Sequence, residues 1–394
     1  MLYFMLSYNR VEGQKNLSKF ENAELEKQLK ILNKPAVKTV KTKYGDTYDC
    51  VDFYKQRAFD NPLLKDHNFH PKMKSTLSTI KKDSTFSSTT NRSWTIWSKD
   101  GGCPFGTVPV KRMTKDDLIR LTRMPPPEDV TFNAEYDVSN NNSRSNGRYI
   151  SSQEYKVAIA QISYNPHNKF AGAGMKTAVY NPQVNGQQHS GCRLKIHKGS
   201  DILQAGWRVD PTLYGDTKTR FFIHFQAGKI QCFNTVCPGF VQVNHDVPLD
   251  GSFTDISQRG GEIWSMKIYI NRDSSGNRWI LLNDDFTRIG FWPQSLFTDL
   301  KNFATNVDWG GVVYSPPGVP KPPMGSSYFP IENSSYDAYC DDVAIVNKEG
   351  KIIEVDTLAT HTDNPYKVEF KRLSYGAIYK YFVLYGGPGE STHV

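Results

Sequence analysis

Residues 151–394 are dominated by short strand-like segments that are separated by turns. Aromatic and β-branched residues fill these segments, and Gly, Pro, Asn and Asp cluster in the gaps between them. Many short strands with regular turns and little helix favour an all-β fold, an antiparallel two-sheet β-sandwich, over a parallel α/β sheet. The predicted strands are residues 155–162, 175–182, 192–199, 220–226, 240–246, 262–272, 277–283, 287–292, 307–314, 342–346 and 377–387.

Two local patterns refine this prediction. The turn SSGN at 274–277 indicates a hairpin between the strands that flank it. The segment PQSLFTDLKNFA at 293–304 predicts one helix within the body, because Pro293 suits its first turn and four apolar residues share a face. These four residues are Leu296, Phe297, Leu300 and Phe303.

The part of the chain before residue 151 has a different character. Apolar spacing predicts helices at 22–33 and 114–122, and Thr114 is the expected N-cap of the second. Three prolines and then a polar Asn- and Ser-rich run indicate an exposed linker that is open to proteolysis. The expected division is a tail at 1–26, a small α+β domain at 27–123, a linker at 124–150 and the β-sandwich at 151–394.

The positive charge of the chain lies at its front. The formal net charge is +8, and it divides into +9 for residues 1–120 and −1 for residues 121–394. A body that binds nucleic acid would carry its own basic patch, so no nucleic-acid partner is expected. No stretch approaches the ~20 apolar residues of a membrane span, so no membrane partner is expected either. The first residues, MLYFMLSYNR, fall short of the ~7–15 apolar residues of a signal-peptide core.

Each part of the chain holds an even number of the six cysteines, two in the front domain and four in the body. Cys232 and Cys237 have a spacing that a small disulfide loop can close. Together with Cys50 and Cys103 in front, they fit disulfides confined within domains. The remaining body cysteines, at 192 and 340, are left open as a further disulfide or as buried thiols. Neither CxxC nor a paired HxxxH is present, and no metal ion or cofactor is expected.

Long motifs of the body resemble the plant neprosin family, the prolyl-cleaving glutamic endopeptidases. They are AGWRVDPTLYGD (205–216), CFNTVCPGFVQ (232–242), GFWPQSLF (290–297), VDWGGVVYSP (307–316), PPMGSSYFP (322–330) and YGGPG (385–389). Two front motifs, DTYDCVDFYKQRAFDNPLLKDH (46–67) and CPFGTVPVKR (103–112), are similar to the activation domain of that family.

The resemblance implies a fold, a location and partners. The sandwich would be of the jelly-roll or concanavalin-like kind, with a cleft across one face. The chain's own activation domain would cover this cleft until acid and proteolysis remove it. A peptide or protein ligand would then occupy the cleft of a secreted, monomeric protein.

The same family works with two glutamates. One stands before Ala-Gly-Trp and the other follows Trp-Gly-Gly, and the positions here are Gln204 and Val312. Peptide hydrolysis by a carboxyl pair needs one ionised group to take a proton from water and one protonated group to polarise the carbonyl. A Gln amide is no base and Val is apolar. The substitutions therefore predict a catalytically inactive member with no intact catalytic residue.

Other acids and aromatic residues are further candidates for the site. Asp308 shares a strand face with Val312 but lies four residues away, about 13 Å, which is too far to replace the missing carboxylate. Asp216 and Glu262 are possible acids that no pattern places opposite Gln204. Trp207, Tyr214 and Trp309 are candidate peptide-binding residues beside Gln204, because the cleft of this family is lined by aromatic residues.

Three functions remain open from the sequence. The first is a non-catalytic neprosin-fold protein whose cleft binds extended proline-containing peptides. The second is an active endopeptidase that cleaves after proline with other carboxyls. The third is a glycan- or wall-binding sandwich, an idea that rests on fold analogy.

Overall fold

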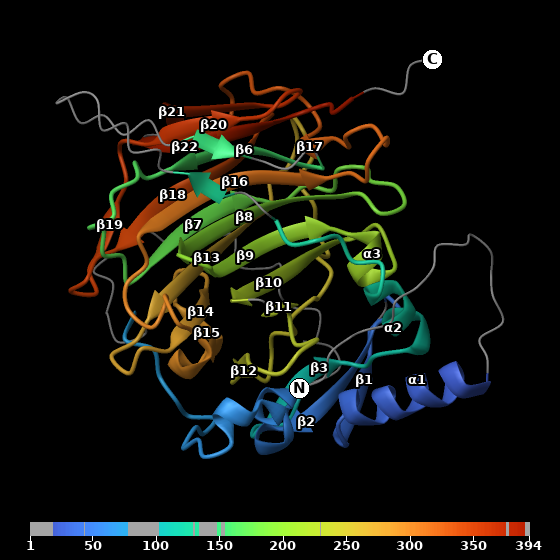
Figure 1. Cartoon of the computed structure of the whole chain (residues 1–394). Coiled ribbons are helices and arrows are strands. Elements are labelled where there is room, and N and C mark those ends of the chain that lie inside the picture. The colour runs from blue at the N-terminus through green and yellow to red at the C-terminus, as the bar shows by residue number, and fades with distance from the viewer. Residues whose placement is uncertain are drawn as a thin grey trace.

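The computed structural model describes residues 19–42, 44–77, 102–128, 131–133, 148–150, 154–228, 230–375 and 378–390. Two large antiparallel sheets lie face to face in the body, and a small sheet with two helices lies at one end of them (Figure 1). The expected all-β sandwich behind a small α+β region is confirmed. Residues 1–18 of the predicted tail and 134–147 of the predicted linker lie outside the described residues.

The first large sheet has seven strands, and each neighbouring pair is antiparallel. Strand β9, which lies next to the middle strand β8, is absent from the predicted set, although it contains Gln204. The order is β11 (Ile230–Phe233), β10 (Thr219–Ala227), β9 (Asp201–Val209), β8 (His189–Lys198), β16 (Asn306–Tyr314), β6 (Tyr155–Gln161) and β20 (Ala359–Thr362).

The second large sheet has ten strands. β13 and β14 form the hairpin predicted around the turn at 274–277. The order is β12 (Val241–Gln242), β15 (Thr287–Trp292), β14 (Arg278–Leu282), β13 (Ser265–Arg272), β7 (Gly172–Ala178), β18 (Ala338–Val346), β22 (Ile378–Gly387) and β17 (Met324–Gly325), with β19 (Ile352–Glu354) on β18 and β21 (Lys367–Tyr375) on β22.

The main core lies between these two sheets, where apolar side chains of both inner faces pack together. Two tryptophans of the seven-stranded sheet also bond across the gap to β7. The indole N–H of Trp207 donates to the carbonyl oxygen of Ala178 at 2.9 Å, and that of Trp309 donates to Gly174 at 3.1 Å. Because a buried N–H without a partner is costly, these bonds fix how the sheets sit on each other.

The front region consists of a three-stranded sheet, β1 (Ala36–Lys41), β2 (Thr47–Asp52) and β3 (Thr107–Lys111), with helices α1 (Lys19–Leu32) and α2 (Lys115–Leu121). Thr114 begins α2 as predicted. Its side chain accepts from the amide of Asp117, whose carboxylate accepts from the amide of Thr114. A short pair, β4 (Thr131–Asn133) and β5 (Arg148–Ile150), follows.

The front region packs on the outer face of the ten-stranded sheet. Phe53 and Leu64 join Trp279 and Phe291 in one buried cluster. Polar contacts reach the other sheet: Arg220 of β10 donates to the carboxylate of Asp46 at 2.9 Å. In addition, the Tyr48 hydroxyl lies 3.1 Å from the carboxylate of Asp250, which it donates to. The front region therefore touches the sandwich at both sheets.

The helix predicted at 293–304 is wrong. Only a single 3₁₀ turn forms, at Gln294–Leu296. The amides of Thr298, Asp299 and Leu300 instead donate to one carboxylate oxygen of Asp201, at 2.6 to 3.0 Å. These donors are thereby satisfied by a side chain from β9, so the chain turns without continuing as a helix.

Both predicted disulfides are present, Cys50–Cys103 and Cys232–Cys237. Cys192 and Cys340 are buried free thiols whose sulfur atoms lie 3.3 Å apart. In the part of the chain that the structure describes, no helix is long and apolar enough to cross a membrane.

Candidate functional site

The outer face of the seven-stranded sheet carries polar side chains at its centre. Leu194 of β8 points into the core, so Arg193 and Lys195 on either side of it point outward. The same alternation along β9 directs Gln204 and Arg208 to this outer face. The four side chains are nevertheless buried, with Arg193 0% and Lys195 1% exposed. Something must therefore cover them.

Strand register places Lys195 and Gln204 in one row across the sheet, together with two further polar side chains. Gln204 pairs with Lys195 of β8 on one side and with His224 of β10 on the other. Lys195 in turn pairs with Asp308 of β16. Asp308 and Gln204 are therefore two strands apart, about 10 Å at the usual strand spacing.

Val312 lies in a different row. It pairs with Gly191 of β8, which pairs with Arg208 of β9. Gln204 and Val312 are thus offset by four residues, about 13 Å along the strands, although both line the same cleft. Val312 is 6% exposed and packs with Tyr155 and other apolar residues of β6 and β16.

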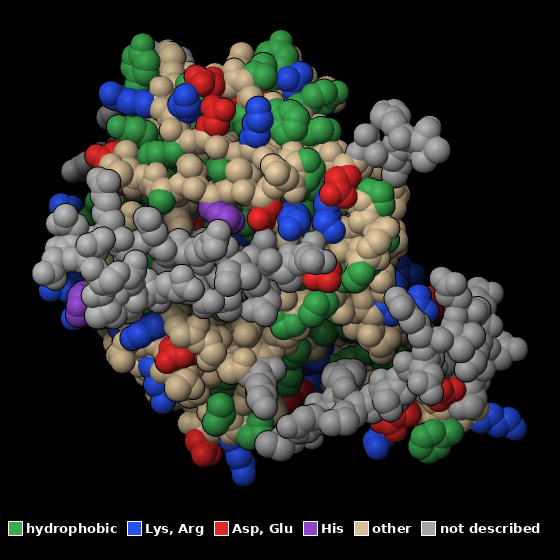
Figure 2. Space-filling view, turned by 45° about the horizontal axis from the view of Figure 1, so that its top comes forward, with side chains coloured by type: hydrophobic (Ala, Val, Ile, Leu, Met, Phe, Trp, Pro, Cys, Tyr) green, Lys and Arg blue, Asp and Glu red, His purple; other side chains and the backbone are tan. Residues whose placement is uncertain are grey.

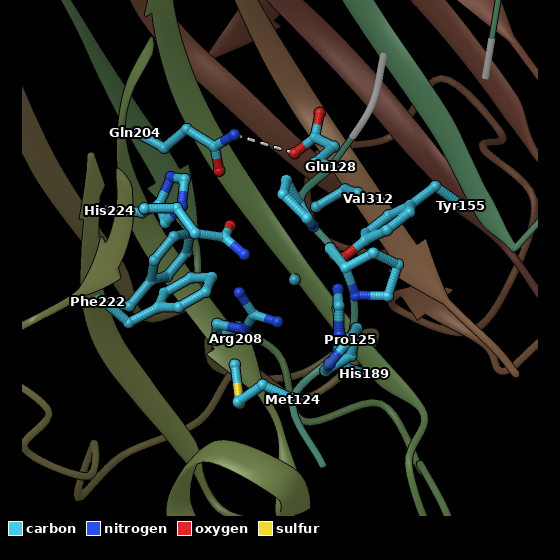
Figure 3. A pocket seen from close by; sticks show the side chains of 15 residues that line it. Met124, Pro125, Glu128, Tyr155, His189, Gln204, Arg208, Phe222, His224 and Val312 are labelled. Atoms are coloured by element: carbon cyan, nitrogen blue, oxygen red, sulfur yellow. Dashed lines mark hydrogen bonds between the residues drawn. The ribbon is translucent and has the colours of Figure 1, made fainter. Parts of the chain in front are cut away.

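Residues 124–128 occupy this cleft, between Gln204 on one side and Val312 on the other (Figure 3). Pro125 is buried, and the Tyr155 hydroxyl donates to the carbonyl oxygen of Pro126 at 2.7 Å. The cavity that remains measures about 20 Å³, room for roughly one water molecule. The prediction of an exposed linker is therefore wrong for Pro125, which is buried, and for Met124 and Glu128, which are partly buried, but it holds for Pro126 and Pro127, which are exposed. Proline has no N–H to satisfy, so a run of three prolines lies in a cleft without leaving buried donors unpaired.

Glu128 ends this segment, and its carboxylate meets three donors from the sheet. Nη2 of Arg193 donates to Oε1 at 2.6 Å and Nε donates to Oε2 at 3.2 Å. Nζ of Lys195 donates to Oε1 at 3.3 Å. Nε2 of Gln204 donates to Oε2 at 3.0 Å (Figure 3). Both oxygens of the carboxylate are therefore held by charged or amide groups.

The charges explain how this carboxylate is held. Burial alone would raise the pKa of Glu128, but the charges of Arg193 and Lys195 outweigh burial and hold that pKa well below its usual value. Arg193 also forms an ion pair with Asp308. Burial, together with the nearby charge of Arg208, lowers the pKa of His224 to about 4. At neutral pH the site therefore contains an ionised Glu128 and a neutral His224.

Two of the aromatic residues predicted to bind peptide are placed elsewhere. Trp207 and Trp309 are 0% exposed and belong to the core between the sheets, so their assignment to the cleft is wrong. They alternate with Gln204 and Val312 along their strands, and this period of two directs them to the opposite face. Tyr214 lines a separate small cavity with Lys111 and Asp250 beneath the front region, so it does not meet Gln204.

Of the three alternative acids, two lie away from the cleft and one lies near it. Asp216 bonds to Arg220 at 2.7 Å, and Glu262 is exposed; neither lines the cleft. Asp308 does lie near the site. From the sequence alone, Asp308 was excluded for its distance from Val312. Strand register nevertheless places it in the same row as Gln204, which the spacing within its own strand does not reveal.

Several residues that form the site were missed from the sequence: Glu128, Arg193, Lys195 and His224. The alternation in CRLKIHK, residues 192–198, is a signal that finds Arg193 and Lys195, since its apolar members face the core. The same alternation along β10 puts His224 on this face. Nothing local marks Glu128, which is 76 residues from Gln204 in the sequence.

Known structures share low similarity with this chain. Scytalido-glutamic peptidase with a transition state analog inhibitor is 9% identical, with 59% of this chain and 97% of that chain covered and a TM-score of 0.31. SCP-B, a member of the Eqolisin family of peptidases in a complex with the tripeptide Ala-Ile-His, is 11% identical, with 59% and 96% covered and a TM-score of 0.31.

Family models give a clear result. The model described as Neprosin matches residues 186–388, more than half of the chain. The model described as Neprosin activation peptide matches residues 39–161, a span that includes Glu128. The chain therefore belongs to the neprosin family and carries a neprosin activation peptide ahead of its neprosin domain.

Proposed function

We propose that this chain is a neprosin-family protein without peptidase activity and that its cleft binds extended proline-containing peptides. One observation carries the proposal. The chain's own segment from Pro125 to Glu128 lies in the cleft, beside Gln204 and Val312 in place of the two expected glutamates.

The chemistry of the site supports the absence of catalysis. Hydrolysis by a carboxyl pair requires one acid that is protonated and one that is ionised at the same pH. The amide side chain of Gln204 does not take up or release a proton near neutral or acid pH, and the side chain of Val312 has no polar atom. The loss of a general base alone typically costs about 10²–10⁴-fold in rate.

The remaining carboxylates do not replace the pair. Asp308 is 1% exposed and forms an ion pair with Arg193. Glu128 is held ionised by the same arginine and by Lys195, and it leaves the cleft together with the covering segment. Of Asp308 and Glu128, only Asp308 remains once that segment is gone. Hydrolysis by a carboxyl pair needs two acids, so Asp308 alone does not replace the pair.

The lining of the cleft supports peptide binding. The cleft around Met124 and Pro125 is lined by the rings of Tyr155, His189 and Phe222 and by the side chain of Val312 (Figure 3). The bond from Tyr155 to the carbonyl of Pro126 uses a backbone group that every peptide has. Apolar walls with a few placed polar groups are typical of ligand sites.

The test is a titration of intact and protease-cut protein with a fluorescent proline-containing peptide, followed by mass spectrometry of the peptide. We expect binding after the covering segment is cut, weaker binding before, and an uncleaved peptide. Binding by neither form would contradict the peptide-binding role. A cleaved peptide would contradict the non-catalytic role. Binding of a glycan on an array, with none of the peptide, would favour a glycan-binding sandwich instead.

Secretion is part of the same proposal. The disulfides Cys50–Cys103 and Cys232–Cys237 support it, because disulfides persist in oxidising compartments. Recovery of a tagged chain from the cell exterior with both disulfides intact is expected, and retention in the cytosol would contradict this.

A further inference from the structure

The donors that hold Glu128 belong to the sheet, whereas the carboxylate belongs to a segment that crosses it. Arg193 and Lys195 are adjacent outward positions of β8, and Gln204 is the neighbour of Lys195 on β9. Their positions are set by strand register and by the packing of the core beneath them. This three-donor group, the carboxylate receptor, is therefore built into the sheet independently of Glu128.

The charge of the receptor requires an anion. With Glu128 in place, the carboxylates of Glu128 and Asp308 match the two cations Arg193 and Lys195. When Glu128 leaves, Asp308 alone faces both cations. These side chains are 0% and 1% exposed while the segment covers them, so its departure leaves two cations that face the open cleft with one carboxylate between them, and this excess of positive charge attracts an anion. The emptied cleft favours a ligand that brings a carboxylate to this point.

The segment that carries Glu128 shows where the rest of such a ligand lies. Glu128 follows three prolines directly, and the first of them is buried beside Tyr155 and Val312. A polyproline run is extended and has few conformations to lose on binding. A rigid run that is anchored at its first proline therefore holds the side chain three residues later, here that of Glu128, at a fixed position.

We infer that the cleft recognises peptides in which a glutamate directly follows prolines, and that Pro125–Glu128 is an internal copy of this ligand. This inference rests on the proposed peptide-binding function and names its ligand class. The glutamate side chain spans from the peptide backbone to Arg193, Lys195 and Gln204. Aspartate is one methylene shorter, so it is held less well.

The test uses the full-length chain with Glu128→Arg, which places a third cation against Arg193 and Lys195 and so drives the covering segment out. Binding of a fluorescent, amidated peptide with the sequence of residues 122–130 is compared with binding of the same peptide carrying Gln in place of its Glu. We expect the Glu peptide to bind at least about tenfold more tightly, as charge-assisted hydrogen bonds to buried groups imply. The wild-type chain, with its own segment in place, should bind at least tenfold more weakly than the variant.

A second substitution assigns the preference to the receptor. Adding Lys195→Met, which keeps the length of the side chain, should reduce the preference for the Glu peptide to about threefold or less. Adding Lys198→Met, which removes a cation of the same strand that is not among the donors to Glu128, should leave the preference unchanged. Circular dichroism and the thermal midpoint verify that each variant is folded.

The outcomes separate the two proposals. Equal binding of the Glu and Gln peptides overturns the carboxylate inference and leaves the peptide-binding function standing. Binding of neither peptide, in a folded variant whose segment is open to protease, overturns both. A peptide that ends in proline with a free carboxylate and binds as tightly as the Glu peptide overturns the assignment to a glutamate side chain.

Discussion

Replacement of Glu128 by Gln should open the cleft of the intact protein. The side chain is 8% exposed and lies against Arg193 and Lys195. Removal of one partner from a buried ion pair costs about 3–5 kcal/mol, because the other charge stays buried. Gln still accepts a hydrogen bond, so the cost should fall near about 3 kcal/mol. Since each 1.4 kcal/mol is tenfold in an equilibrium constant, the ratio of closed to open cleft should fall roughly 100-fold.

Trypsin cleavage after Arg123 measures this opening. Arg123 is exposed and directly precedes the segment, but a protease needs the residues on both sides of the bond to be free, and Pro125 is buried. When opening and closing are fast, the cleavage rate follows the population of the open form. Denaturing gels over time should show cleavage of Glu128→Gln one to two orders of magnitude faster than that of the wild type.

The control is Glu354→Gln, which removes an exposed carboxylate of β19 on the other sheet. Its cleavage rate should match that of the wild type. Equal rates for wild type and Glu128→Gln would refute the reasoning, because Glu128 would then contribute nothing to closure.

Three further outcomes are expected. The pKa of Glu128 is held well below 4.5, so its contribution to stability is fully present above pH 4.5 and is lost as pH falls below that value. The urea midpoints of wild type and Glu128→Gln should therefore differ by a constant amount above pH 4.5 and begin to converge below it. Burial raises the pKa of Asp250 to about 6, so its ionisation destabilises the fold as pH rises. Asp250→Asn should therefore raise the free energy of unfolding, measured in urea, by up to about 3 kcal/mol at pH 7.5. The difference between this variant and the wild type should shrink towards pH 4. Trp309→Ala should lower that free energy by about 3–5 kcal/mol, measured by the same titration, whereas a residue that only bound peptide would change affinity alone.

The sandwich was predictable because its strands are short, rich in aromatic residues and bounded by turn residues.

The near-neutral charge of the body was also predictable from the sequence. Figure 2 shows Lys, Arg, Asp and Glu interspersed over the described part of that face rather than gathered into one basic patch. Gln204 and Val312 were also predictable as residues of one site, since each stands beside a motif of the resemblance and both line the cleft.

The rest of the site depended on contacts that the sequence does not contain. Glu128 meets Gln204 only because the chain folds back over the sheet, and the three prolines before it indicated only a loop. The prediction placed Trp207 and Trp309 in the cleft because they are aromatic. The alternation of side chains along their strands, with a period of two residues, directs them to the core instead. The helix at 293–304 failed because Asp201, distant in sequence, captures its backbone amides.

The most direct test of the central claim is the turnover of a purified wild-type chain on a proline-containing reporter peptide after acid treatment and proteolytic release of the covering segment. Gln204→Glu together with Val312→Glu, prepared in the same way, provides the matched comparison. We predict no turnover above background for the wild type and measurable cleavage after proline for the double variant. Many turnovers per molecule by the wild type, free of contaminating peptidase, would contradict the account.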